Sequence, residues 1–64
     1  MNNKVIEWYD AAAFTPPTTE DVLICTEDKR GHRNVSKAYF TEGAWVRHGD
    51  AKVIAWAFIN YPQF

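Results

Sequence analysis

Short apolar runs, each bounded by turn signals, constrain this chain more than any other feature of its sequence. The runs at 22–26, 35–41, 44–48 and 52–59 are rich in β-branched and aromatic residues, which favour strands. Charged or glycine-containing turns lie between them at 27–34, 42–43 and 48–51, where Gly31 and Gly43 permit a positive φ. The sequence therefore predicts a mainly β fold, most simply a small antiparallel meander of about four strands.

The segment before these runs is expected to join or cover the sheet. Residues 4–9 alternate weakly and could form a short strand. Residues 10–14 fit at most one helical turn with Asp10 as its cap, because Pro16 and Pro17 prevent a longer helix. The Pro-containing stretch 10–19 is the expected cover of the last strand, where Ala55 and Ala57 permit close approach.

The period of two along a strand assigns side chains to faces. In the run 35–41, the odd-numbered residues are expected on one face and the even-numbered residues on the other. In the last run, Trp56 and Phe58 share the heavier face with Ile54 and are predicted to enter the core. Beyond this strand, Tyr61 and Phe64 either fold back as a lid on the sheet or remain exposed as a binding edge.

One domain, residues 1–64, accounts for the whole length, because a domain usually needs about 50 residues or more. Cys25 is the single cysteine, so three tryptophans, three tyrosines and four phenylalanines must supply the stability that disulfides give other small domains. The single thiol and the lack of a basic and then apolar leader after Met1 indicate a cytoplasmic setting. No apolar run approaches the roughly 20 residues that a membrane helix needs.

The net charge is only −1, but its distribution is uneven. Residues 1–28 carry six acids and one base, whereas residues 29–64 carry six bases and two acids. Either these charges interleave once the chain folds, or they form a dipolar surface that steers a charged partner.

No arrangement of residues predicts catalysis, a cofactor or a metal site. Cys25 lies inside an apolar run and is expected to be buried there rather than to pair with His32 or His48. The neighbouring carboxylates at 20–21 and 27–28 flank one strand, where solvated turns are their usual role. The paired ligand spacing of zinc sites and a Gly-rich phosphate loop are both missing from the sequence. We therefore expect a protein that is not an enzyme.

Several short motifs follow one another along nearly the whole chain. They begin at Trp8, continue through a proline, "VLIC", "YF" and "GAW", and end with "VIAW" and a further proline. This order resembles a small phage and prophage domain family of unknown function that reads roughly W-I-x-V, L-P, V-L-V, G-x-W and T-H-W-x-P-L-P. The matching residues are Trp8, Pro17, Val22, Leu23, Gly43, Trp45, Trp56 and Pro62. The resemblance implies an antiparallel β fold and a mobile-element origin, but no activity, and the family's His is Ala55 here.

The leading hypothesis is a non-catalytic module that binds a host or viral protein. Small mobile-element proteins can act by occluding a partner's surface, and by analogy the partner would be a host defence complex such as a CRISPR effector. Tyrosine, tryptophan and arginine are the usual anchors of such interfaces. The candidate partner-binding residues are Arg30, Arg33, Tyr39, Trp45, Arg47, Tyr61 and Phe64.

Two other classes of function stay open at this point. A small nucleic-acid-binding β domain would use the basic loop 29–33 with Lys37, Tyr39, Trp45 and Arg47 on one face, as cations and stacking platforms. A homodimer or larger homo-oligomer would pair an exposed strand edge with a second copy of the chain.

Overall fold

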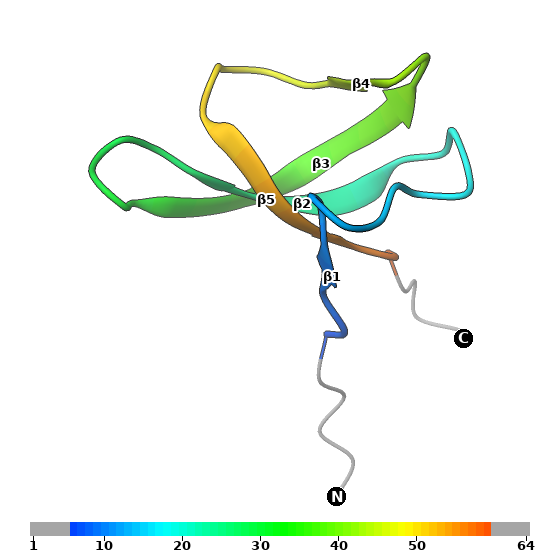
Figure 1. Ribbon diagram of the computed structural model, residues 1–64, viewed down its shortest axis with the longest axis horizontal. Helices are drawn as coiled ribbons and strands as arrows, with labels where there is room; N and C mark the ends of the chain where they lie inside the picture. Colours follow the sequence, from blue (N-terminus) through cyan, green and yellow to red (C-terminus); the bar gives the residue numbers. More distant parts are fainter. Residues whose placement is uncertain (1–5, 60–64) are drawn as a thin grey trace, which may run out of the picture.

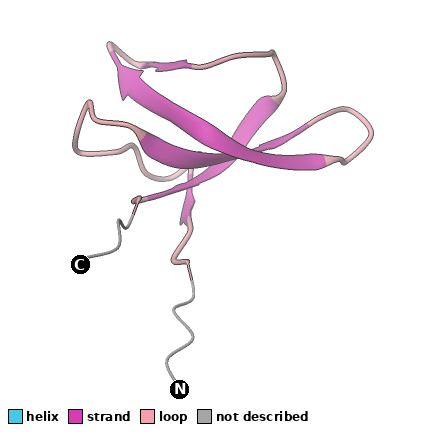
Figure 2. Cartoon of the chain, turned by 180° about the vertical axis from the view of Figure 1, so that it is seen from behind, coloured by secondary structure: helices cyan, strands magenta, loops and turns pink. Residues whose placement is uncertain are grey.

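A computed structural model describes residues 6–59, which form one open antiparallel sheet without a helix (Figure 1, Figure 2). Its five strands are β1 (Tyr9–Asp10), β2 (Val22–Glu27), β3 (Arg33–Thr41), β4 (Ala44–Val46) and β5 (Lys52–Ala57). Their order in space is β1-β5-β2-β3-β4. The prediction of a small, mainly β, antiparallel domain is confirmed.

The position of β5 differs from that in a simple meander. Strands β2, β3 and β4 follow one another as hairpins, but β5 pairs with β2 instead of β4. The loop 47–51 therefore connects two strands that are not neighbours (Figure 1). A strand that is apolar on both faces is better protected between two neighbours than at an edge, and β5 lies between β1 and β2.

The β3–β4 turn has the geometry that its sequence predicts. Thr41 pairs with Ala44, and the two residues between them, Glu42 and Gly43, have φ values of 51° and 78°. Two positive φ values are typical of the type I′ turn, whose twist matches that of the flanking strands. Glycine adopts such a φ freely, whereas Glu42 is strained there.

We expect Glu42→Asn to stabilise the protein by about 0.5–1 kcal/mol, because asparagine tolerates a positive φ better than glutamate. The matched substitution Gly43→Ala places a Cβ at φ 78° and should destabilise by about 1 kcal/mol. Urea unfolding followed by circular dichroism measures both changes. Equal stability of the two variants would contradict this turn geometry.

The segment 10–17 forms the expected single turn and then crosses the sheet. The Phe14 N–H donates to the Asp10 carbonyl at 2.9 Å, and the Ala12 N–H donates to Asp10 Oδ1 at 2.8 Å. Further along, Pro16 is buried, and the Phe14 carbonyl accepts a hydrogen bond from Trp56 Nε1 at 3.1 Å. The segment therefore covers the Trp56 face of β5, not the Ala55 and Ala57 face, because the indole needs an acceptor once it is buried.

All of the buried core residues except Ala57 lie on one face of the sheet, which we call the covered face. Its buried cluster consists of Val22, Ile24, Ala38 and Trp56. The Tyr9 ring stacks on Trp56 with centroids 4.7 Å apart, and Phe58 meets Trp56 edge-on at 5.0 Å. Trp56 is 2% exposed, as expected of a core residue, but Phe58 is 43% exposed because it lies beyond the end of β5.

A β-bulge changes the alternation of side chains along β5. Ala55 pairs with Cys25, but the next residue of β2, Thr26, pairs with Val53, so Ile54 is the extra residue. Val53 consequently packs against the core on the same side as Trp56. Strict alternation placed Val53 on the opposite face, and the bulge is the physical reason for the difference.

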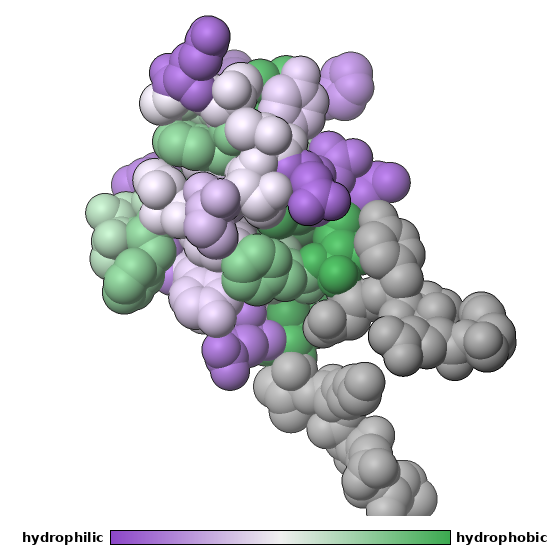
Figure 3. All heavy atoms as spheres, turned by 90° about the vertical axis from the view of Figure 1, so that its right-hand side faces the viewer, coloured by the Kyte–Doolittle hydropathy of each residue, from purple (hydrophilic) through white to green (hydrophobic). Residues whose placement is uncertain are grey.

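The loop 47–51 lies over the other end of the covered face. A hollow there is lined by Thr26, Asn34 and Ser36 from the sheet and by residues 47–51 from the loop. The covered face is thus overlaid by segment 10–17 at one end and by this loop at the other. In the side view of Figure 3, hydrophobic areas are separated by polar ones and form no single patch.

Candidate protein-binding face

The second face of the sheet, which we call the open face, is arranged in rows by the cross-strand pairs. Cys25 lies between Ala55 and Val35, and Leu23 lies between Ala57 and Lys37. Tyr39 pairs with Val46 on the same side of β3 as Val35 and Lys37. Directly opposite residues have their side chains on one face, so these rows make an apolar strip that contains one cation, Lys37, and ends at Asp10, which pairs with Ala55. The open face therefore consists of Asp10, Leu23, Cys25, Val35, Lys37, Tyr39, Val46, Ala55 and Ala57, of which Ala57 is buried, together with the charged row of Arg33, Glu27 and Lys52.

The outer half of the open face is accessible to solvent. Val35 is 53% exposed, Val46 is 43% exposed and Tyr39 is 38% exposed. Leu23 and Cys25 are half-buried, so the thiol is less enclosed than the sequence led us to expect. The side chains in the middle of the strip, Cys25 and Ala55, are small, whereas the side chains that β3 and β4 contribute are larger.

Charged side chains form one rim of the open face. Glu27 pairs with Arg33 on one side and with Lys52 on the other. Arg33 Nε donates to Glu27 Oε2 at 3.1 Å, so the Glu27 carboxylate offsets the charge of Arg33 rather than that of Lys52. Within residues 6–59, Lys37 forms no salt bridge. The open face thus presents an excess of positive charge along β3.

The candidate residues from the sequence come together only in part, because Tyr39 and Arg47 line one hollow with Lys37 while the others lie elsewhere. Arg33 and Tyr39 lie on the open face, whereas Trp45 lies on the covered face and meets Phe40 edge-on at 5.1 Å. Arg30 belongs to the β2–β3 turn. The Arg47 guanidinium donates to the Gly49 carbonyl at 2.9 Å within the loop 47–51. Tyr61 and Phe64 lie outside the described residues.

The register of the β3–β4 hairpin explains this separation. Phe40 pairs with Trp45, and Tyr39 pairs with Val46, so Tyr39 and Trp45 point to opposite faces. Of the basic aromatic face predicted for nucleic acid, Lys37, Tyr39 and Arg47 line one hollow, but Trp45 lies on the other face of the sheet. The two-residue turn at 42–43 already implies this register. Counting outward from the pair Thr41 and Ala44 places Val46, not Trp45, opposite Tyr39.

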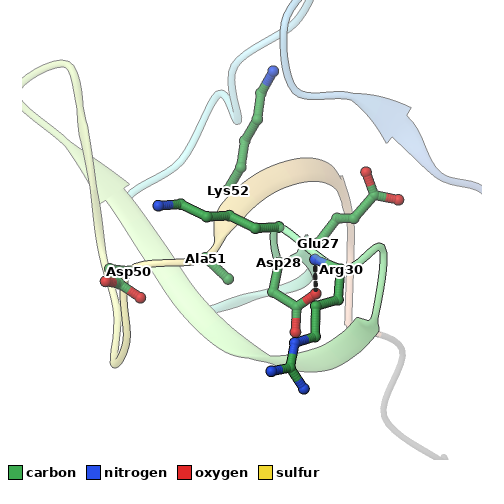
Figure 4. Close-up of a pocket in the computed structure, with 7 residues that line it drawn as sticks. Glu27, Asp28, Arg30, Asp50, Ala51 and Lys52 are labelled. Atoms are coloured by element: carbon green, nitrogen blue, oxygen red, sulfur yellow. Dashed lines mark hydrogen bonds between the residues drawn. The ribbon is translucent and has the colours of Figure 1, made fainter.

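A charged hollow between the β2–β3 turn and the loop 47–51 is the main alternative site. Its lining combines three acids and three bases, namely Glu27, Asp28, Lys29, Arg30, Asp50 and Lys52, together with Ala51. In Figure 4, the side chains of Glu27, Arg30 and Lys52 point in different directions. The Asp28 carboxylate already accepts the Arg30 N–H at 2.9 Å. Charges of the two chain halves interleave here, but no group of side chains converges on a ligand.

Neither a metal site nor a similarity to a known protein points to another functional site. Among the described residues, no three His, Cys, Asp or Glu side chains come together in a way that could hold a metal ion. The same part of the chain contains no helix long and apolar enough to cross a membrane. The sequence matches no protein-family model and no curated protein, and its structure matches no solved structure.

Proposed function

We propose that this protein is a non-catalytic interaction module that binds another protein through the open face of its sheet. The observation that carries the proposal is the exposure of Val35, Tyr39 and Val46 on one face, where Tyr39 and Val46 are directly opposite and Lys37 lies between Val35 and Tyr39. Burying apolar surface yields about 25 cal/mol per Å², and grouped apolar side chains on a surface mark interaction sites.

The chemistry of the open face also suits a protein partner. Protein interfaces combine an apolar centre, in which tyrosine is a frequent anchor, with a polar rim. Here Tyr39 and its apolar neighbours supply the centre, and Arg33 and Lys37 supply part of the rim. Because Tyr39 and Trp45 lie on opposite faces, stacking of nucleic-acid bases on a shared basic surface is the less supported alternative.

The biological setting of the proposal comes from the resemblance to the phage and prophage domain family. It would make the protein a mobile-element product that acts in the host cytoplasm and occludes a host defence complex, in the manner of an anti-CRISPR protein. The choice of a host defence complex as the partner rests on the sequence resemblance and on analogy. The open face supports only the binding of a protein.

Affinity capture with matched variants tests the proposed function. The tagged wild-type protein, Val35→Glu, Val46→Glu and the control Phe14→Glu are incubated with bacterial host lysate, and the retained molecules are identified by mass spectrometry. Phe14 is 59% exposed, and its carbonyl accepts a hydrogen bond from Trp56 on the covered face, away from the open face. Circular dichroism first establishes that each bait is folded.

We expect wild type and Phe14→Glu to retain the same protein, and each open-face variant to retain at least about tenfold less, which corresponds to about 1.4 kcal/mol. Retention of nucleic acid alone, or no retention by a folded wild-type bait, would overturn the proposal. Equal retention by all four baits would show that another surface binds the partner.

A further inference from the structure

Strand β3 extends well beyond the short strand beside it. It pairs with β2 over residues 33–38 but with β4 only over residues 39–41. After Val46 the chain leaves the sheet and passes over the covered face toward β5 (Figure 1). Within residues 6–59, no strand pairs with the outer edge of β3 at 33–37.

The hydrogen-bond pattern identifies which backbone groups point outward along this edge. In an antiparallel pair, residues that exchange hydrogen bonds alternate with residues that do not. The Asp28 N–H donates to the His32 carbonyl at 3.0 Å, and stepping by two makes residues 34 and 36 the bonded positions of β3. Arg33, Val35 and Lys37 therefore direct their N–H and C=O groups away from β2. Their side chains lie on the open face, so the free edge and the open face are continuous.

We propose that the partner adds an extended antiparallel strand to this edge, with an acidic, an apolar and a second acidic side chain at alternate positions. The inference rests on the proposed function and specifies its partner. Residues of an added strand opposite Arg33, Val35 and Lys37 would share the open face with them. Opposite charges suit the two cations, and an apolar side chain suits Val35. Within residues 6–59, the guanidinium of Arg33 bonds to Glu27 through Nε alone, so its other N–H groups can meet an acid of the added strand.

Charge argues against a second copy of this chain as the added strand. Two-fold pairing centred on Val35 would set Arg33 of one copy opposite Lys37 of the other. Pairing centred on Ser36 would bring the two Lys37 side chains to diagonal positions on one face. Like charges at these positions destabilise a sheet, whereas an acidic strand removes the repulsion.

Peptide binding followed by nuclear magnetic resonance tests the inference. The probes are the capped peptides Thr-Glu-Thr-Val-Thr-Glu-Thr and Thr-Lys-Thr-Val-Thr-Lys-Thr, added to ¹⁵N-labelled protein at low salt. We expect the acidic peptide to bind at least about tenfold more tightly than the basic one. The amides of Val35 and Lys37 should shift and become protected from hydrogen exchange, while the Ser36 amide, already paired with β2, changes little.

Two variants separate the backbone and the charge contributions. Val35→Pro removes an outward N–H without removing a bond to β2, and it should abolish binding of the acidic peptide. Lys37→Glu should reduce the preference for the acidic peptide about tenfold. Lys52→Glu, the control, makes the same charge change on the open face but on β5, and it should leave most of the preference intact.

Several results would overturn the inference. These are equal binding of both peptides, shifts centred on residues other than those of β3, or an unchanged preference in Lys37→Glu. A dimer in sedimentation equilibrium that Val35→Pro dissociates would identify a second copy as the occupant. If Val46→Glu loses a captured protein that Val35→Pro retains, the added strand is excluded while the proposed function stands. If no variant of the open face affects capture, the proposed function fails as well.

Discussion

Replacing Trp56 with alanine should leave much of the protein unfolded at room temperature. The indole is 2% exposed, stacks on Tyr9, meets Phe58 edge-on and donates to the Phe14 carbonyl. Removing a buried tryptophan costs about 3–5 kcal/mol. A domain of this length has a free energy of unfolding of about 3–10 kcal/mol in total. Trp56→Ala therefore removes a large part, or all, of the stability.

Trp56→Phe is the matched control, since it keeps an aromatic ring but loses the N–H donor. It leaves the Phe14 carbonyl without this part-buried bond and should cost about 1–3 kcal/mol, including some loss of packing. Thermal and urea unfolding, followed by far-ultraviolet circular dichroism, measure both variants. If Trp56→Ala unfolds at the same urea concentration as wild type, the ring is not the centre of the core.

Asp28→Ala should destabilise the protein by about 1–2 kcal/mol, although Asp28 is exposed. Its Oδ1 accepts the backbone N–H groups of both Arg30 and His32 at 2.9 Å and so closes the β2–β3 turn. Hydrogen exchange should accelerate at these two amides, and urea unfolding should give the loss of stability.

Asp28→Asn and Asp50→Ala serve as controls for this result. Asparagine retains a side-chain oxygen that can accept the same two bonds, so its loss of stability should be less than half that of alanine. Asp50 lies in the facing loop of the same hollow, and its removal should change stability by less than about 0.5 kcal/mol. An equal loss for Asp28→Ala and Asp50→Ala would point to general charge effects rather than to the turn.

Local features of the fold could be predicted from the sequence, because they depend on neighbouring residues. The turn at Glu42 and Gly43, the turn containing Gly31 and the turn capped by Asp10 all occur as expected. The position of β5 depends instead on how a doubly apolar strand is best enclosed, which is a property of the whole sheet. The bulge at Ile54 has no sequence signal that we could identify, since the residue resembles its apolar neighbours.

The candidate site was harder to predict for a related reason. Residue type alone favours aromatic and basic side chains as anchors, but the hairpin register places Tyr39 and Trp45 on opposite faces. Nothing in the sequence distinguishes Val35 and Val46 from other strand residues, because their exposure follows from which segments cover the sheet. The loop 47–51 and the segment 10–17 both lie on the other face, which alternation within single strands cannot reveal.

The pairing of β5 with β2 also has a consequence for the order of folding. The β2–β3 and β3–β4 hairpins each close over a few residues, whereas Ile24 must meet Trp56 from a distant part of the chain. Contacts of such long sequence separation slow folding, because more chain entropy is lost before they form. During synthesis the two hairpins leave the ribosome before β5, with Val22 and Ile24 not yet enclosed. Docking of β5 is therefore the step at which this chain gains its core, and also the step before which it is most exposed to aggregation and proteolysis.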